Sequence, residues 1–142
     1  MNEAVVRVER VLPASPEAVF DAWTDPASLR AWMAPDPLSV AEAECDARVG
    51  GAFRIVMIDG AGAIEHTGRY LELDRPHRLA FTWRSAETGS IDTHVSVDLT
   101  DTPAGTRMVI THGALPTQDM RENHHHGWSG IADKLAIMLG AN

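Results

Sequence analysis

The sequence predicts one α+β domain over residues 1–142, in which a curved antiparallel sheet of six to seven strands covers a long C-terminal helix. Three observations support this fold class. The segment 66–83 contains two strands with alternating apolar residues, joined by a turn at Pro76. Short turn signals separate the other strand patterns, as is usual in antiparallel sheets. From about Thr117 the apolar period changes from two residues to that of a helix.

The N-terminal part predicts one strand followed by two short helices. Alternating valines indicate a strand over residues 3–12, with Val6 and Val8 on one face and Val11 as a further candidate. Ser15-Pro16-Glu17 is a helix-start sequence, because Ser caps free N–H groups, Pro fits the first helical position and Glu faces the positive helix end. Asp25-Pro26 repeats this signal. The apolar stripes of the two helices are Val19, Phe20 and Trp23, and Leu29, Trp32 and Met33.

Six strand patterns follow. Residues 38–44 form a candidate edge strand, and Asp59-Gly60 is a hairpin signal between the next two strands. The inward-facing residues that alternation predicts for the later strands are Phe53, Ile55 and Met57; Leu71 and Leu73; Leu79, Phe81 and Trp83; Val95, Val97 and Leu99; and Thr106, Met108, Ile110 and His112.

The final helix carries its apolar stripe at His124, Trp128, Ile131 and Leu135, which are spaced by four, three and four residues. Gly127 and Gly130 also lie within this helix, where glycine costs about 1 kcal/mol relative to alanine. Such a glycine often marks the close approach of another element.

Composition excludes several classes of protein. The formal net charge is −8, and Lys134 is the only lysine, so no nucleic-acid partner is expected. Charges interrupt the apolar runs, so neither a signal peptide nor insertion into a membrane is expected, and the expected location is cytoplasmic. Cys45 is the only cysteine, which excludes an intrachain disulfide, and we interpret it as a plain thiol.

Six segments, in this order, resemble one family of the START/Bet v 1-like (SRPBCC) superfamily, the domain family named after the Hsp90 ATPase activator. They are residues 15–24 (SPEAVFDAWT), 29–35 (LRAWMAP), 46–54 (DARVGGAFR), 68–83 (GRYLELDRPHRLAFTW), the last strand with Thr106, Ile110 and His112, and Gly127-Trp128 followed by Leu135. The resemblance covers nearly the whole chain. It implies a helix-grip fold, in which an antiparallel sheet grips the long helix and leaves a cavity between them.

Activity does not follow from this fold, because it hosts lipid carriers, aromatase-cyclases, hormone binders and co-chaperone domains. Our leading hypothesis is a protein that binds a small hydrophobic or amphipathic molecule between the sheet and the C-terminal helix. The inward faces carry many aromatic and methionine side chains, with Phe81 and Trp83 expected opposite Trp128 and His124. The candidate cavity-lining residues are Trp32, Phe53, Met57, His66, Tyr70, Phe81, Trp83, Met108, His112, His124 and Trp128.

Three histidines support the alternative hypothesis that the protein is an enzyme. His66, His112 and His124 have strand or helix parities that direct all three inward, where they would orient a ligand or act as acid and base in a cyclase- or hydrolase-like reaction. The other interpretation is that each is a hydrogen-bonded core histidine, and no catalytic residue is assigned. His125 and His126 follow His124 directly, so on a helix they diverge, and neither a metal site nor a cofactor is expected.

The sequence is compatible with two kinds of protein partner. A second alternative function is an Hsp90-type co-chaperone module, although the chain resembles only one domain of that two-domain activator. Weak homodimerisation through exposed strand edges at Val5-Val6 or Leu38–Val40 is also considered.

Overall fold

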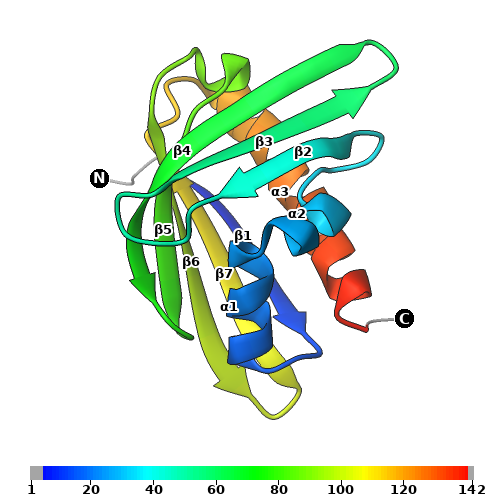
Figure 1. The fold of residues 1–142 in the computed structure, drawn as a ribbon, viewed down its shortest axis with the longest axis vertical. Helices are drawn as coiled ribbons and strands as arrows, with labels where there is room; N and C mark the ends of the chain where they lie inside the picture. The colour runs from blue at the N-terminus through cyan, green and yellow to red at the C-terminus, as the bar shows by residue number, and fades with distance from the viewer. Residues whose placement is uncertain (1–4, 141–142) are drawn as a thin grey trace.

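A computed structural model describes residues 5–140 as a curled seven-stranded antiparallel sheet around a long C-terminal helix (Figure 1). The elements are β1 (Val6–Leu12), α1 (Pro16–Thr24), α2 (Pro26–Trp32), β2 (Ser39–Cys45), β3 (Ala52–Asp59), β4 (Gly62–Asp74), β5 (Arg78–Trp83), the short 3₁₀ helix η1 (Ala86–Thr88), β6 (Thr93–Thr102), β7 (Gly105–Gly113) and α3 (Gln118–Met138). This order of elements confirms the α+β fold that the sequence predicts. Residues 3 and 4 of the expected first strand lie outside the described residues.

The strands lie in the order β1-β7-β6-β5-β4-β3-β2, and every neighbouring pair is antiparallel. Strands β2 to β7 follow one another by short connections, whereas β1 returns to pair with the last strand, β7. The two edges of the sheet are therefore β1 and β2, the strands in which edges were expected. Helix α3 contacts β1 and α2, so it closes the concave side of the sheet (Figure 1).

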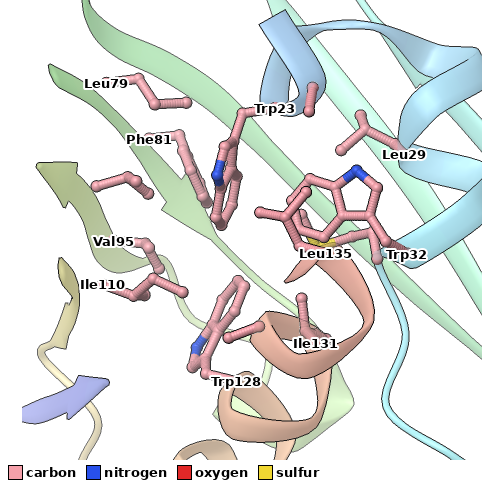
Figure 2. Close-up of a cluster of buried hydrophobic side chains, with 14 of the residues drawn as sticks. Trp23, Leu29, Trp32, Leu79, Phe81, Val95, Ile110, Trp128, Ile131 and Leu135 are labelled. Atoms are coloured by element: carbon pink, nitrogen blue, oxygen red, sulfur yellow. The ribbon is translucent and has the colours of Figure 1, made fainter. Parts of the chain in front are cut away.

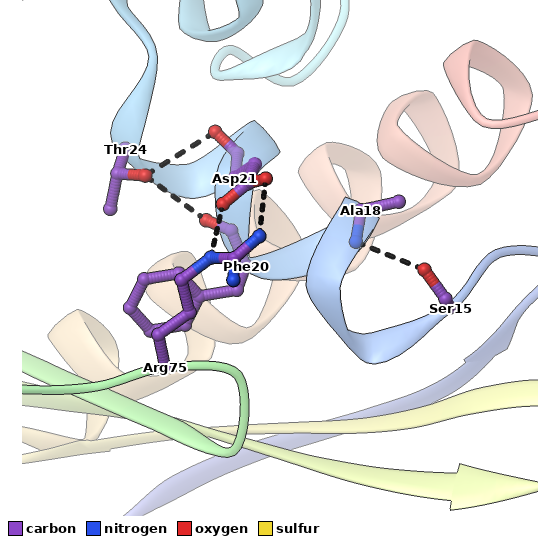
Figure 3. Close-up of polar contacts among 6 residues, drawn as sticks. All are labelled: Ser15, Ala18, Phe20, Asp21, Thr24 and Arg75. Carbon is purple, nitrogen blue, oxygen red and sulfur yellow. Dashed lines mark hydrogen bonds and ion pairs between the residues drawn. The ribbon is translucent and has the colours of Figure 1, made fainter.

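The two short helices begin where their capping sequences predict. The Ser15 hydroxyl accepts a hydrogen bond from the Ala18 N–H at 3.2 Å, and the Asp25 carboxylate accepts one from Ala27 at 3.1 Å. Figure 3 shows a second anchor of α1, in which Arg75 from the β4–β5 turn grips Asp21 with two N–O contacts of 2.8 and 2.9 Å.

One continuous apolar core joins the sheet, α1, α2 and α3 (Figure 2). Trp23 of α1 lies at its centre, with ring centroids 4.8 Å from Trp32, 6.1 Å from Phe81 and 6.1 Å from Trp128. Each of these four side chains is at least nine-tenths buried. The surplus of large aromatic residues that the sequence shows is thus used first for packing between sheet and helices.

One inward assignment from the sequence is wrong. Leu71 is 50% exposed, whereas Tyr70 is only 3% exposed. The pairing of β4 with β5 shifts between Tyr70 and Glu72, so Leu71 is an extra residue that interrupts the alternation. Val11 does lie in β1, as expected, but it is 54% exposed because it points away from the buried face that carries Val6, Val8 and Leu12.

Candidate functional site: a cleft beside the long helix

A partly open cleft of about 520 Å³ lies between α3 and the strands β3 and β4. The residues that line it come from the segment before β2, from β3 to β5, from η1 and from one side of α3: Pro35, Asp36, Leu38, Met57, Asp59, Ile64, His66, Trp83, Glu87, Asn123, His124, His126, Gly127, Trp128, Gly130, Ile131, Asp133, Lys134 and Ile137. Its volume falls within the range of about 300–1,000 Å³ that is usual for small-molecule sites.

Two helical glycines set the edge of the cleft. A Cβ atom on Gly130 would lie 3.0 Å from the Cβ atom of Pro35, and one on Gly127 would lie 4.0 Å from its Cγ atom. The close approach that glycine predicts within this helix is therefore made by Pro35. It brings the segment before β2 against α3 and gives the cleft one of its walls.

The deep wall of the cleft is apolar and aromatic. The ring centroids of Trp83 in β5 and Trp128 in α3 are 5.1 Å apart, and both residues are 2% exposed. Met57, Ile64 and Ile131 extend this wall along β3, β4 and α3. Trp83 contacts Trp128 of α3 as expected and borders the cleft, whereas the ring of Phe81 packs against Trp23 of α1 and is not part of the cleft.

His66 is the buried polar residue of this wall. It is 3% exposed, its ring centroid lies 4.8 Å from that of Trp83, and its Nδ1 atom has no hydrogen-bond partner within residues 5–140. The indole N–H of Trp83 is also buried and unpartnered among the described residues. Burial lowers the pKa of His66, so its ring is neutral near neutral pH.

His112 lies behind the cleft in a closed chain of hydrogen bonds. Its Nδ1 atom accepts from the Trp128 indole N–H at 3.0 Å, which places its own proton on Nε2. Nε2 lies 2.7 Å from the Thr93 hydroxyl, and that hydroxyl donates to the Trp83 carbonyl at 2.6 Å. Burial lowers the pKa of His112 to about 3. A neutral ring with both nitrogens engaged positions Trp128 and leaves no atom for acid–base work.

His124 occupies the boundary between this chain and the cleft. Its Nδ1 atom lies 2.8 Å from the Met120 carbonyl oxygen and therefore donates to it. Its ring packs edge-on against His112 at 4.9 Å between centroids, and the residue is 8% exposed. The inward parities expected for all three histidines agree with their burial.

The eleven candidate cavity residues divide into three groups. Met57, His66, Trp83, His124 and Trp128 line the cleft. Phe53, Tyr70 and Phe81, together with Trp83, border a separate void of about 10 Å³, which is no larger than one water molecule. Trp32, Met108 and His112 are packed in the core, each at most 1% exposed. The space beside α3 is thus a lateral cleft, and a role in ligand binding stays a prediction for all eleven residues.

Sequence reasoning missed the polar rim of the cleft. The rim residues on α3 are Asn123, Gly127, Gly130 and Lys134, which are spaced by four, three and four residues and lie beside the apolar stripe. This helical spacing in the sequence could have predicted that they share one face of the helix. Glu87 gave no such signal, because it lies in the single turn of η1 between two strands and reaches the cleft only through the tertiary fold.

Further chemistry of the described residues is limited. Within residues 5–140 no group of three or more His, Cys, Asp or Glu side chains has the arrangement of a metal site, and His125 and His126 are exposed while His124 is buried. Cys45 donates to the Thr24 carbonyl at 3.3 Å, and burial raises the pKa of its thiol. In this part of the chain, no helix combines the length and the apolar character needed to span a bilayer.

The protein is a helix-grip domain of the Bet v 1/START-like class. Its curled antiparallel sheet surrounds a long C-terminal helix, two short helices follow the first strand, and a cleft lies beside the long helix. Residues 13–140 match the model of the family described as activator of Hsp90 ATPase homolog 1-like protein. The chain belongs to this family.

Solved structures from several bacteria are similar to the chain. Protein CV1439 from Chromobacterium violaceum is 31% identical, with a TM-score of 0.88 over 97% of this chain and 98% of that one. The AHSA1 (SPO3351) protein from Silicibacter pomeroyi is 29% identical, with a TM-score of 0.82 over 96% and 97%. Protein NE0264 from Nitrosomonas europaea is 27% identical, with a TM-score of 0.81 over 95% and 93%. No curated protein matches the chain.

Proposed function

We propose that the protein binds a small, largely apolar molecule in the cleft between α3 and strands β3 and β4. Membership of a helix-grip family, whose fold typically binds ligands, supports the general function. The observation that carries the specific proposal is a partly open cleft of about 520 Å³ with an aromatic deep wall, formed by Trp83 and Trp128, and a polar rim.

The physical reason lies in the apolar surface of this wall. Each Å² of apolar surface that a bound molecule removes from water contributes about 25 cal/mol. The apolar body of the molecule would cover Trp83, Trp128 and Met57, and its polar group would lie at the rim of the cleft. The methionine and indole surfaces adapt to ligands of different shape.

The test fills the cleft without disturbing the core. In Gly127→Leu, the new side chain starts 4.0 Å from Pro35 and extends into the cleft, while leucine favours the helix more than glycine does. His125→Leu is the matched control, because it adds the same side chain at an exposed position of α3 outside the cleft.

The measurement is binding of 1-naphthylmethanol by isothermal titration calorimetry, with native mass spectrometry of the purified protein for a co-purifying molecule. We expect the wild type and His125→Leu to bind the probe and Gly127→Leu to bind it at least about tenfold more weakly. Equal binding by Gly127→Leu, or no binding by the folded wild type, would refute the proposal.

Acid–base catalysis by His124 is a second candidate, because its Nε2 atom has no hydrogen-bond partner among the described residues and the residue lines the cleft. The cyclase- or hydrolase-like alternative predicts that His124→Ala abolishes turnover of a bound ester or polyketide-like substrate while the fold persists. Retained turnover in that variant would exclude it.

Protein partners stay predictions. Retention of the chain in a pull-down with an Hsp90-type chaperone tests the co-chaperone role, and a concentration-dependent mass in analytical ultracentrifugation tests homodimerisation through β1 or β2.

A further inference from the structure

We infer that the molecule bound in this cleft is a cationic amphiphile, with a protonated amine or another ammonium group beside Glu87 and an apolar body against Trp83 and Trp128. This inference rests on the proposed function and specifies the ligand class of the same site.

Carboxylates dominate the charged rim of the cleft. Four acids line it, namely Asp36, Asp59, Glu87 and Asp133, against one amine, that of Lys134. The Lys134 ammonium already lies 3.0 Å from Asp36 and 3.3 Å from the Leu38 carbonyl oxygen. The rim thus keeps an excess of carboxylates, and its single ammonium group is already paired. The other basic side chains of the lining are the imidazoles of His66, His124 and His126.

Two of these four carboxylates already pair with a cation of the protein, and two do not. Asp133 pairs with Arg10 at 3.1 Å and Asp36 pairs with Lys134, whereas Asp59 and Glu87 form no ion pair with any residue of the described chain. Asp59 accepts hydrogen bonds from the backbone of the β3–β4 turn through Oδ1. Glu87 and Asp59 are therefore the two carboxylates of the cleft that still lack a cation.

Glu87 is also held in place. The Asn123 side-chain amide of α3 donates to its Oε2 atom at 2.7 Å, and η1 begins with a capping box at Ser85. The Oε1 atom has no hydrogen-bond partner within residues 5–140. A fixed, half-buried carboxylate with one free oxygen is a strong acceptor for an ammonium N–H.

The neighbouring groups favour the same charge. Indole faces attract cations through their π electrons, and Trp83 and Trp128 form the wall next to this end of the cleft. Burial lowers the pKa of His66, so its neutral ring lines the same wall without adding a positive charge. An anionic amphiphile such as a fatty acid would instead meet Glu87 and Asp59 with no free cation to receive it.

The test compares three probes with one apolar body and different charges: 1-naphthylmethylamine, 1-naphthylmethanol and 1-naphthoate, each titrated calorimetrically at pH 7.5. We expect the amine to bind about tenfold more tightly than the alcohol, with 1-naphthoate the weakest, and the preference for the amine to shrink at high salt.

Variants assign the preference to the rim. Glu87→Gln keeps the shape and the acceptor for Asn123 but removes the charge, and Asp59→Asn does the same at the turn. Each should lower the ratio of amine affinity to alcohol affinity, Glu87→Gln the more strongly. Asp101→Asn, which makes the same change of charge at an exposed position outside the cleft, is the control and should leave the ratio as in the wild type.

The outcomes separate the two proposals. Equal binding of the amine and the alcohol, or an unchanged ratio in both Glu87→Gln and Asp59→Asn when their thermal melts show a folded protein, overturns the cationic class and leaves the proposed function standing. Failure of the wild type to bind any of the three probes overturns the proposed function, and this inference falls with it.

Discussion

Replacement of Thr93 by valine should destabilise the protein far more than the loss of one hydroxyl group at the surface would. Thr93 is fully buried, and its hydroxyl lies between His112 Nε2 at 2.7 Å and the Trp83 carbonyl at 2.6 Å. Valine has nearly the same shape, so Thr93→Val leaves no cavity and tests the hydrogen bonds alone.

The magnitude follows from the groups that lose their partner. The Nε2–H of His112 and one acceptor site of the Trp83 carbonyl would remain buried without a bond, at about 1–3 kcal/mol each. We therefore expect a loss of about 2–6 kcal/mol, which is a large share of the roughly 5–15 kcal/mol that stabilise a domain of this kind. Trp128 should also become less ordered, because its partner His112 is then free to change tautomer.

The assay is urea denaturation followed by tryptophan fluorescence, which gives the free energy of unfolding. The matched control is Thr100→Val, since Thr100 lies on the same strand, β6, but is exposed. It should stay within about 0.5 kcal/mol of the wild type. If Thr93→Val is also within that margin, the chain from Trp128 to the Trp83 carbonyl does not stabilise the fold as we describe.

Three further predictions concern stability. Burial lowers the pKa of His112 from 6.5 to about 3, so between these pH values the unfolded chain binds a proton that the folded chain does not bind. The free energy of unfolding should therefore decrease by up to about 1.4 kcal/mol for each pH unit below pH 6.5. Urea curves that are constant from pH 6.5 to pH 5 would contradict this. Gly68→Ala would place a Cβ atom in overlap with the Thr82 carbonyl oxygen, so a loss of about 3 kcal/mol or more is expected in the same assay. An unchanged midpoint would be incompatible with this packing. Asp21→Asn breaks an exposed ion pair with Arg75 and should cost less than about 1 kcal/mol in a thermal melt, with less effect in high salt; a loss of several kcal/mol would show that Arg75 anchors α1 more strongly than exposed pairs usually do.

Most of the structural features that the sequence predicts correctly follow from helix capping, turn residues and apolar periodicity. The capping sequence at Ser15, the hairpin signal at Asp59 and the change of period near Thr117 each depend on a few adjacent residues, and each lies where the structure begins or turns an element. Leu71 failed the same reasoning, because an extra residue in the pairing with β5 reverses the alternation. The alternation of apolar residues along one strand does not show where the pairing with its neighbour shifts by one residue.

The candidate site was predictable only in part. Parity placed His66, His124 and Trp128 on inward faces, but parity does not distinguish a side chain that borders a cleft from one that is packed, such as Met108. That distinction depends on which neighbour fills the adjoining space. Among the described residues, Pro35 lies against α3, and the space beside Trp83 and Trp128 lies between that helix and strands β3 and β4.

The sequence alone determined the order and type of the elements, the inward faces of most of them, and the resemblance to a helix-grip family, because these depend on local periodicity, capping and short words in a fixed order. The tertiary structure decided that most of the aromatic surplus packs as core, that His112 is locked between Trp128 and Thr93, and that the space is a lateral, acid-rimmed cleft. Contacts between residues far apart in the chain set these features. Glu87 and Asn123, separated by 36 positions and joined at 2.7 Å, come together only when the sheet curls around α3.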